Sequence, residues 1–151
     1  DPELVFRRLT ALSATCPKIG THMSGSAIDV SVLRMDDFSE VDRGGPYIEL
    51  SELTPMDSSF ISPEAARNRA EISEIFRKRG FIAYPYEFWH YSKGDAYSES
   101  LGDSGKPARY GPVDADLSSG KVSAMPNPGE SLHSMEDFRK HIEPLLGRLK
   151  G

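Results

Sequence analysis

The chain has 151 residues, of which 38% are hydrophobic and 27% are charged, and this balance is typical of a folded globular domain. The formal net charge of −5 favours neither nucleic acid nor an anionic membrane as a partner, and no apolar run approaches the ~20 residues that span a bilayer. A single cysteine excludes an internal disulfide. We therefore expect one domain over residues 1–151 that acts on a small molecule or a peptide.

The first expected elements are a helix and a strand. Apolar residues recur at helical spacing after an Asp-Pro pair typical of a helix start, which predicts a helix over 3–14. Alternation over 27–33 predicts a strand with Ile28 and Val30 on one face and Asp29 on the other. If the apolar face meets the core, the Asp29 side chain points into a cleft.

His22 precedes Asp29 by seven residues, with Gly25 between them. Because glycine adopts backbone angles that other residues avoid, the chain can turn sharply at Gly25. We expect this turn to bring His22 back over the strand that carries Asp29.

The middle of the chain predicts a short strand near 47–50 and then a helix. Ser62 has the character of an N-cap followed by a first-turn proline, and the helix should run to about Arg79 before Gly80 ends it. The helix's expected apolar residues are Ala66, Ala70, Ile72, Ile75 and Phe76.

The sequence FIAYPYEFWHYS, residues 81–92, predicts two short strands broken at Pro85. Glu87 and His90 are three residues apart and would face opposite sides of a regular strand. Both can face one site only if Glu87 lies in the turn before the second strand and His90 within that strand.

The last third of the chain divides into two segments. Residues 94–128 are dense in Gly, Pro, Ser and Asp and predict a long loop. Residues 134–149 then predict a C-terminal helix with an apolar stripe.

Together these elements offer a catalytic metal site. His22, Asp29 and His90 are three candidate ligands of the types that hold one catalytic zinc ion, which keeps a further position open for water. Glu87 is the candidate general base beside them. The alternative for the second motif is an aromatic core strand with an exposed glutamate and a partly buried histidine.

These residues resemble the zinc peptidases of the M15 group, in particular the bacterial D-alanyl-D-alanine dipeptidases of the VanX type. The family pattern SxHxxGxAxD is matched by HMSGSAID from His22 to Asp29, and the pattern ExWH is matched by EFWH from Glu87 to His90. Between them, TPMDSSF resembles the segment whose aspartate holds the substrate's free amino group. The resemblance covers about residues 1–92.

The resemblance implies an α+β fold, a small antiparallel sheet flanked by helices of the Hedgehog and DD-peptidase type. It also implies one Zn²⁺ ion, a small dipeptide as substrate, and D-Ala-D-Ala hydrolysis linked to cell-wall turnover or glycopeptide resistance. The amino-group role falls on Asp57. The compartment would be bacterial cytoplasm or periplasm, and the oligomeric state is left open.

Two departures from the family pattern bear on activity. Gly20 stands where the family has a serine near the substrate, and the family's upstream arginine, which polarises the scissile carbonyl, has no matching segment. The chain also begins without methionine, inside a helical pattern, so we expect it to lack the N-terminal part of the family domain. A stabiliser of this kind contributes ~2.7–4 kcal/mol, so the chain is expected to bind zinc but to hydrolyse D-Ala-D-Ala poorly.

Two alternative functions remain at this point. One is a zinc D,D- or L,D-carboxypeptidase that trims peptidoglycan stem peptides, and the other is a noncatalytic zinc-binding module of the same fold. Asp57 bears on the first alternative, because an ammonium anchor disfavours substrates extended at the amino end. The presence of Glu87 argues against the noncatalytic module, whereas the missing arginine favours it.

Overall fold

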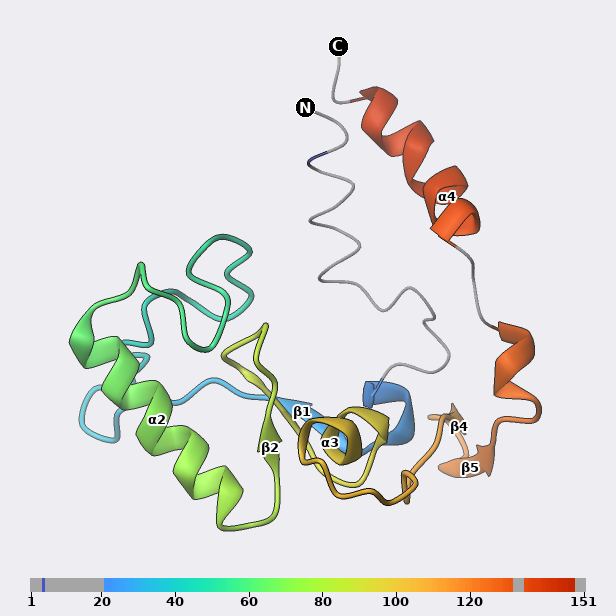
Figure 1. Cartoon of the computed structure of the whole chain (residues 1–151), viewed down its shortest axis with the longest axis horizontal. Helices are drawn as coiled ribbons and strands as arrows, with labels where there is room; N and C mark the ends of the chain where they lie inside the picture. The colour runs from blue at the N-terminus through green and yellow to red at the C-terminus, as the bar shows by residue number, and fades with distance from the viewer. Residues whose placement is uncertain (1–3, 5–20, 132–134, 149–151) are drawn as a thin grey trace. The chain divides into compact units, whose positions relative to one another are not determined.

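The computed structural model describes residue 4 and residues 21–131 and 135–148 (Figure 1). The chain divides into two compact units, and Gly25–Tyr110 is the unit that contains Asp29, Glu87 and His90. Its elements are β1 (Ala27–Asp29), α2 (Pro63–Arg77), β2 (Ile82–Ala83), β3 (His90–Ser92) and α3 (Ala96–Leu101). The described elements outside it are η2 (Thr21–Ser24), β4 (Val113–Asp116), β5 (Lys121–Ala124), η3 (Pro128–Ser131) and α4 (Met135–Arg148).

The site is carried by a three-stranded antiparallel sheet of order β1-β3-β2. In the register of β1 with β3, Asp29 pairs with His90 and Ala27 pairs with Ser92. All three residues of β3 are buried, because β3 is the central strand. This short antiparallel sheet with a few helices is compatible with the fold expected for M15 peptidases.

The predicted break at Pro85 is confirmed. β2 ends at Ala83 and β3 begins at His90, and Glu87 lies in the turn between them. The backbone N–H of Tyr84 donates to the carbonyl of His90 at 2.9 Å and closes this turn. Because Glu87 lies in the turn and not in a strand, its side chain can lie on the same side as that of His90.

The predicted strand over 27–33 is too long. β1 ends at Asp29, Ala27 is buried, and Ile28 is 39% exposed, so the apolar face expected from Ile28 and Val30 is not the core face. The chain continues as an irregular loop that closes through a single bridge between Leu33 and Glu40.

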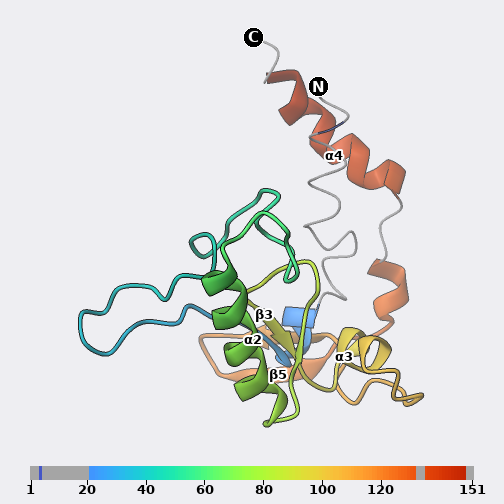
Figure 2. The same ribbon diagram turned by 60° about the vertical axis from the view of Figure 1, so that its left-hand side comes forward.

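Helix α2 begins where the sequence predicted, and it ends at Arg77, two residues before the predicted Arg79. The Ser62 hydroxyl accepts a hydrogen bond from the N–H of Ala65 at 3.0 Å, and Pro63 occupies the first turn, where its missing N–H costs nothing. Gly80 follows with φ of +79°, a conformation that favours glycine. Figures 1 and 2 show α2 lying alongside the sheet, and Phe76 stacks on Tyr91 with ring centroids 4.1 Å apart.

The buried face of α2 differs from the expected apolar side. Ile72 is buried as predicted, but Ala66 and Ala70 are exposed and Ile75 is 63% exposed. The other buried residues of the helix are Ala65 and Arg69. Apolar spacing does not predict this face of the helix, because its central residue, Arg69, is charged.

Arg69 connects α2 to the loop that precedes it. Its guanidinium donates to the carbonyls of Arg43, Leu53 and Pro55 at 2.6 to 2.8 Å, and the side chain is almost fully buried. Burial lowers its pKa below the usual arginine value. It also lies over the Phe88 ring, 4.1 Å from the centroid, and so fixes the turn that carries Glu87.

Arg69→Met is therefore expected to destabilise the protein by about 3 kcal/mol, because buried carbonyls lose their donors. Chemical denaturation followed by circular dichroism measures this change. Arg67→Met, on an exposed position of the same helix, is the matched control and should change the free energy of unfolding by less than ~0.5 kcal/mol. Equal effects of the two substitutions would show that the hydrogen bonds of Arg69 contribute nothing to stability.

Two further predictions differ from the structure. Residues 47–50 form a turn rather than a strand, with Ile48 at φ of +63°. Residues 94–128 are not one loop, because they contain α3 and the β4–β5 hairpin.

At the C-terminal end, α4 occupies Met135–Arg148 within the predicted range 134–149 and continues through Pro144. The predicted helix over 3–14 lies outside the described residues, apart from Leu4. Gly20, which differs from the family pattern, also lies outside them. Among the described helices, none combines the length and apolar character needed to cross a membrane.

Candidate metal centre

The centre of the candidate site is a carboxylate and an imidazole on neighbouring strands. Asp29 ends β1 and His90 begins β3, so the register places them side by side. His90 Nδ1 lies 3.1 Å from Asp29 Oδ1, and the two side chains are 6% and 24% exposed. The antiparallel pairing thus explains why two motifs about sixty residues apart in the sequence meet.

The other ring nitrogen of His90 has its own partner. His90 Nε2 lies 3.0 Å from the hydroxyl oxygen of Ser92, and both residues are buried. Ser92 was not predicted as a site residue from the sequence. A signal was present, since residues two apart in a strand lie on the same face.

Glu87 lies beside the same imidazole. Its Oε2 is 3.8 Å from His90 Nδ1, and its side chain is 16% exposed. Burial raises the pKa of the Glu87 carboxyl, His90 lowers it, and the negative charge of Asp29 raises it further. A carboxylate with this environment can accept a proton in a reaction and return it.

Tyr47 is a second site residue that was not predicted from the sequence. Its hydroxyl lies 3.4 Å from Asp29 Oδ2, and its ring packs edge-on against Trp89 with centroids 5.9 Å apart. Burial and the nearby carboxylate of Asp29 raise the pKa of the Tyr47 hydroxyl, which therefore stays protonated as a donor. No local pattern connects Tyr47 with Asp29, because a loop without regular structure joins them.

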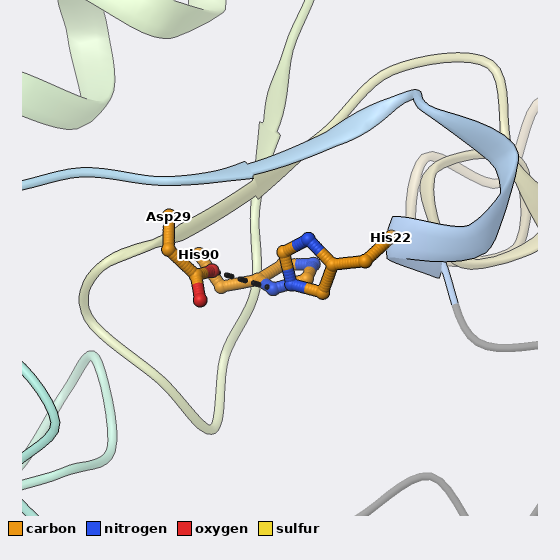
Figure 3. A group of neighbouring side chains, drawn as sticks. All are labelled: His22, Asp29 and His90. Atoms are coloured by element: carbon orange, nitrogen blue, oxygen red, sulfur yellow. Dashed lines mark ion pairs between the residues drawn. The ribbon is translucent and has the colours of Figure 1, made fainter. Parts of the chain in front are cut away.

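His22 lies in η2, the turn that leads into β1. The Ser24 hydroxyl donates to the Thr21 carbonyl within this turn, and Gly25 follows with φ of +67°, as expected for a sharp turn at that glycine. Figure 3 shows His22, Asp29 and His90 as neighbouring side chains, and one ligand atom from each lies within 4.8 Å of the others.

The donor set fits a zinc ion. Two imidazoles and one carboxylate are ligands typical of catalytic zinc, and two atoms on one tetrahedral zinc are about 3.3 to 3.6 Å apart. The distance of 3.1 Å between His90 Nδ1 and Asp29 Oδ1 is close to that separation. The group is a possible His/Asp metal site, and its chemistry does not by itself distinguish zinc from other divalent ions.

Asp57 is exposed, in a turn of the loop before α2. Burial lowers the pKa of Arg69, and the negative charge of Asp57 offsets a small part of that effect. The nearby hydrogen bond from Phe88 N–H to the Thr54 carbonyl, 3.2 Å long, ties this loop to the turn that carries Glu87.

Two arginines of the described residues, Arg34 and Arg69, are engaged away from the candidate site. Arg34 pairs with Asp36 on an exposed loop, at 3.3 Å, and Arg69 donates to buried carbonyls. Arg7 and Arg8 lie outside the described residues.

Comparison with known proteins supports the family resemblance. Residues 9–105 match the peptidase M15 family, described as D-Ala-D-Ala dipeptidase. The chain is 34% identical to a D-alanyl-D-alanine dipeptidase of Synechocystis sp. over 110 residues, covering 62% of this chain and 44% of the relative. It is 35% identical over 71 residues to one of Enterococcus faecium, covering 47% of this chain and 35% of the relative. With one of Escherichia coli it shares 31% identity over 80 residues, covering 53% and 41%. The chain thus spans less than half the length of each of these relatives.

Proposed function

Because this chain belongs to the peptidase M15 family of D-Ala-D-Ala dipeptidases, we propose that it is a zinc metallopeptidase that hydrolyses the dipeptide D-Ala-D-Ala. The observation that carries the proposal is the carboxylate of Glu87 beside the Asp29–His90 pair. We also propose that the sheet and its flanking helices have the arrangement found in Hedgehog and DD-peptidase-like folds. Such an activity would serve cell-wall peptide turnover or glycopeptide resistance.

In this proposal His22, Asp29 and His90 hold one zinc ion, and Glu87 is not a ligand. The ion would polarise the scissile carbonyl and lower the pKa of a water molecule toward ~7. Glu87 would take the proton of the attacking water and return it to the leaving amine. Tyr47, through its contact with Asp29 Oδ2, would keep that carboxylate oriented.

The proposed role of Asp57 is to bind the ammonium group of the substrate. Its position on an exposed turn leaves the carboxylate accessible to a small ligand. A fixed anion for the amino end restricts the enzyme to short substrates, which is the property that separates a dipeptidase from a carboxypeptidase.

The proposal is tested by measuring bound zinc after dialysis and then hydrolysis of D-Ala-D-Ala. We expect one zinc per chain, loss of hydrolysis on chelation, and recovery when zinc is returned. Bound zinc without hydrolysis at any substrate concentration would support the noncatalytic module instead.

The substrate's free amino group should matter strongly. Asp57→Asn is expected to lower kcat/KM for D-Ala-D-Ala about 10- to 100-fold, the value of one charge-assisted hydrogen bond. N-acetyl-D-Ala-D-Ala should be a poor substrate for the parent chain. Asp114→Asn, on the exposed strand β4, is the control and should leave kcat/KM unchanged. Preference for the acetylated substrate would favour the carboxypeptidase.

A further inference from the structure

The buried side of the His90 ring faces a serine hydroxyl. His90 Nε2 and Ser92 Oγ are 3.0 Å apart, and the residues are 5% and 3% exposed. We propose that Ser92 is a positioning residue that keeps the imidazole proton of His90 on Nε2, so that Nδ1 is left free of a proton to bind the metal. This inference rests on the proposed metal site but not on hydrolysis.

The backbone fixes Ser92 from both sides. Ser92 pairs with Ala27 of β1 and with Ile82 of β2, so it lies in the central strand with a partner on each edge. Alternation along β3 places its side chain on the same face as that of His90. The hydroxyl therefore has a defined position relative to the ring.

The position of the Ser92 hydroxyl affects which nitrogen of a neutral His90 imidazole can bind a metal ion. One ring nitrogen carries a proton and the other offers a lone pair, and only the lone pair can bind a metal ion. If Nε2–H donates to Ser92 Oγ, the lone pair is on Nδ1, the atom 3.1 Å from Asp29 Oδ1. The opposite arrangement, with the Ser92 hydroxyl donating to Nε2, places the proton on Nδ1 and blocks that atom.

Asp29 alone would favour the blocked arrangement, because a carboxylate beside Nδ1 accepts a hydrogen bond from a protonated nitrogen. The Ser92 oxygen can accept the proton of Nε2 when Nδ1 is needed for the metal. An alanine at this position would leave the Nε2 proton buried without an acceptor. Relative to alanine, the hydroxyl thus lowers the free energy of the metal-binding tautomer.

The test is the zinc affinity of Ser92→Ala, measured by competition with a chromogenic chelator. We expect zinc to bind about 10- to 100-fold more weakly, the usual loss when the partner of a metal-bound histidine is removed. Ser92→Thr, which keeps the hydroxyl, should restore most of the affinity. Ser98→Ala is the matched control, because Ser98 is also buried and its hydroxyl donates to the backbone carbonyl of Asp95. This control should keep the zinc affinity even if its unfolding midpoint falls as much as that of Ser92→Ala.

A second readout reports the proton directly. In zinc-loaded protein with ¹⁵N-labelled histidine, long-range ¹H–¹⁵N spectra should show the proton of His90 on Nε2 in the parent chain and in Ser92→Thr. A proton on Nδ1, zinc bound equally well by Ser92→Ala, or a parent chain that binds no zinc would each overturn the inference. If zinc affinity depends on the Ser92 hydroxyl but the chain does not hydrolyse D-Ala-D-Ala, the role of Ser92 is supported and the proposed dipeptidase activity is wrong.

Discussion

Glu87→Gln is expected to lower kcat for D-Ala-D-Ala ~100-fold or more while the protein keeps its zinc. The amide has nearly the shape of the carboxylate but cannot accept the proton of the attacking water. Glu87 Oε2 lies 3.8 Å from His90 Nδ1, beside the proposed ligands, so the substitution removes a base without removing a ligand. The measurements are single-turnover hydrolysis and bound zinc on the same sample.

The same substitution should not destabilise the zinc-free protein. Burial raises the pKa of the Glu87 carboxyl above its ordinary value of 4.5. The folded protein therefore binds this proton more tightly than the unfolded chain does. Stability is then lost as the pH rises from 4.5 through the folded-state pKa, and at neutral pH the buried carboxylate costs stability. A neutral glutamine avoids that cost, so the unfolding midpoint of the zinc-free form should stay equal or rise.

Glu71→Gln is the control for this experiment, because Glu71 is exposed on α2. It should leave kcat and zinc content unchanged. If Glu87→Gln loses zinc in parallel with activity, Glu87 is a ligand and the role given to it is wrong.

His90→Ala is expected to remove zinc from the protein. Structural zinc sites with four ligands bind with about 10 to 16 kcal/mol, so one ligand contributes about 3 to 4 kcal/mol and its loss weakens binding ~100- to 1000-fold. Zinc should then be lost on dialysis, and added zinc should no longer raise the unfolding temperature. The zinc-free variant should also be less stable, because Asp29 loses the imidazole 3.1 Å away.

His141→Ala provides the comparison, since this histidine lies outside both metal motifs. It should retain one zinc per chain and the zinc-dependent rise in unfolding temperature. Zinc retained by His90→Ala would mean that the metal is held by other residues.

Features that depend on neighbouring residues could be predicted from the amino-acid sequence alone. The cap at Ser62, the end of α2 before Gly80 and the break at Pro85 follow from backbone angles and hydrogen bonds within a few positions. The same local rules put Glu87 in a turn and His90 at the start of a strand. The grouping of His22, Asp29 and His90 was predicted because metal chemistry restricts which residue types can act together.

Features that depend on register and burial could not be predicted without the tertiary structure. Tyr47 meets Asp29 only because an irregular loop returns to the sheet, and the burial of Arg69 depends on carbonyls of residues far from it in sequence. Strand β1 pairs through Ala27–Asp29 with the three residues of β3 and ends there, although its sequence alternates further. Contacts of this kind are set by long-range pairing, for which local propensity carries no information.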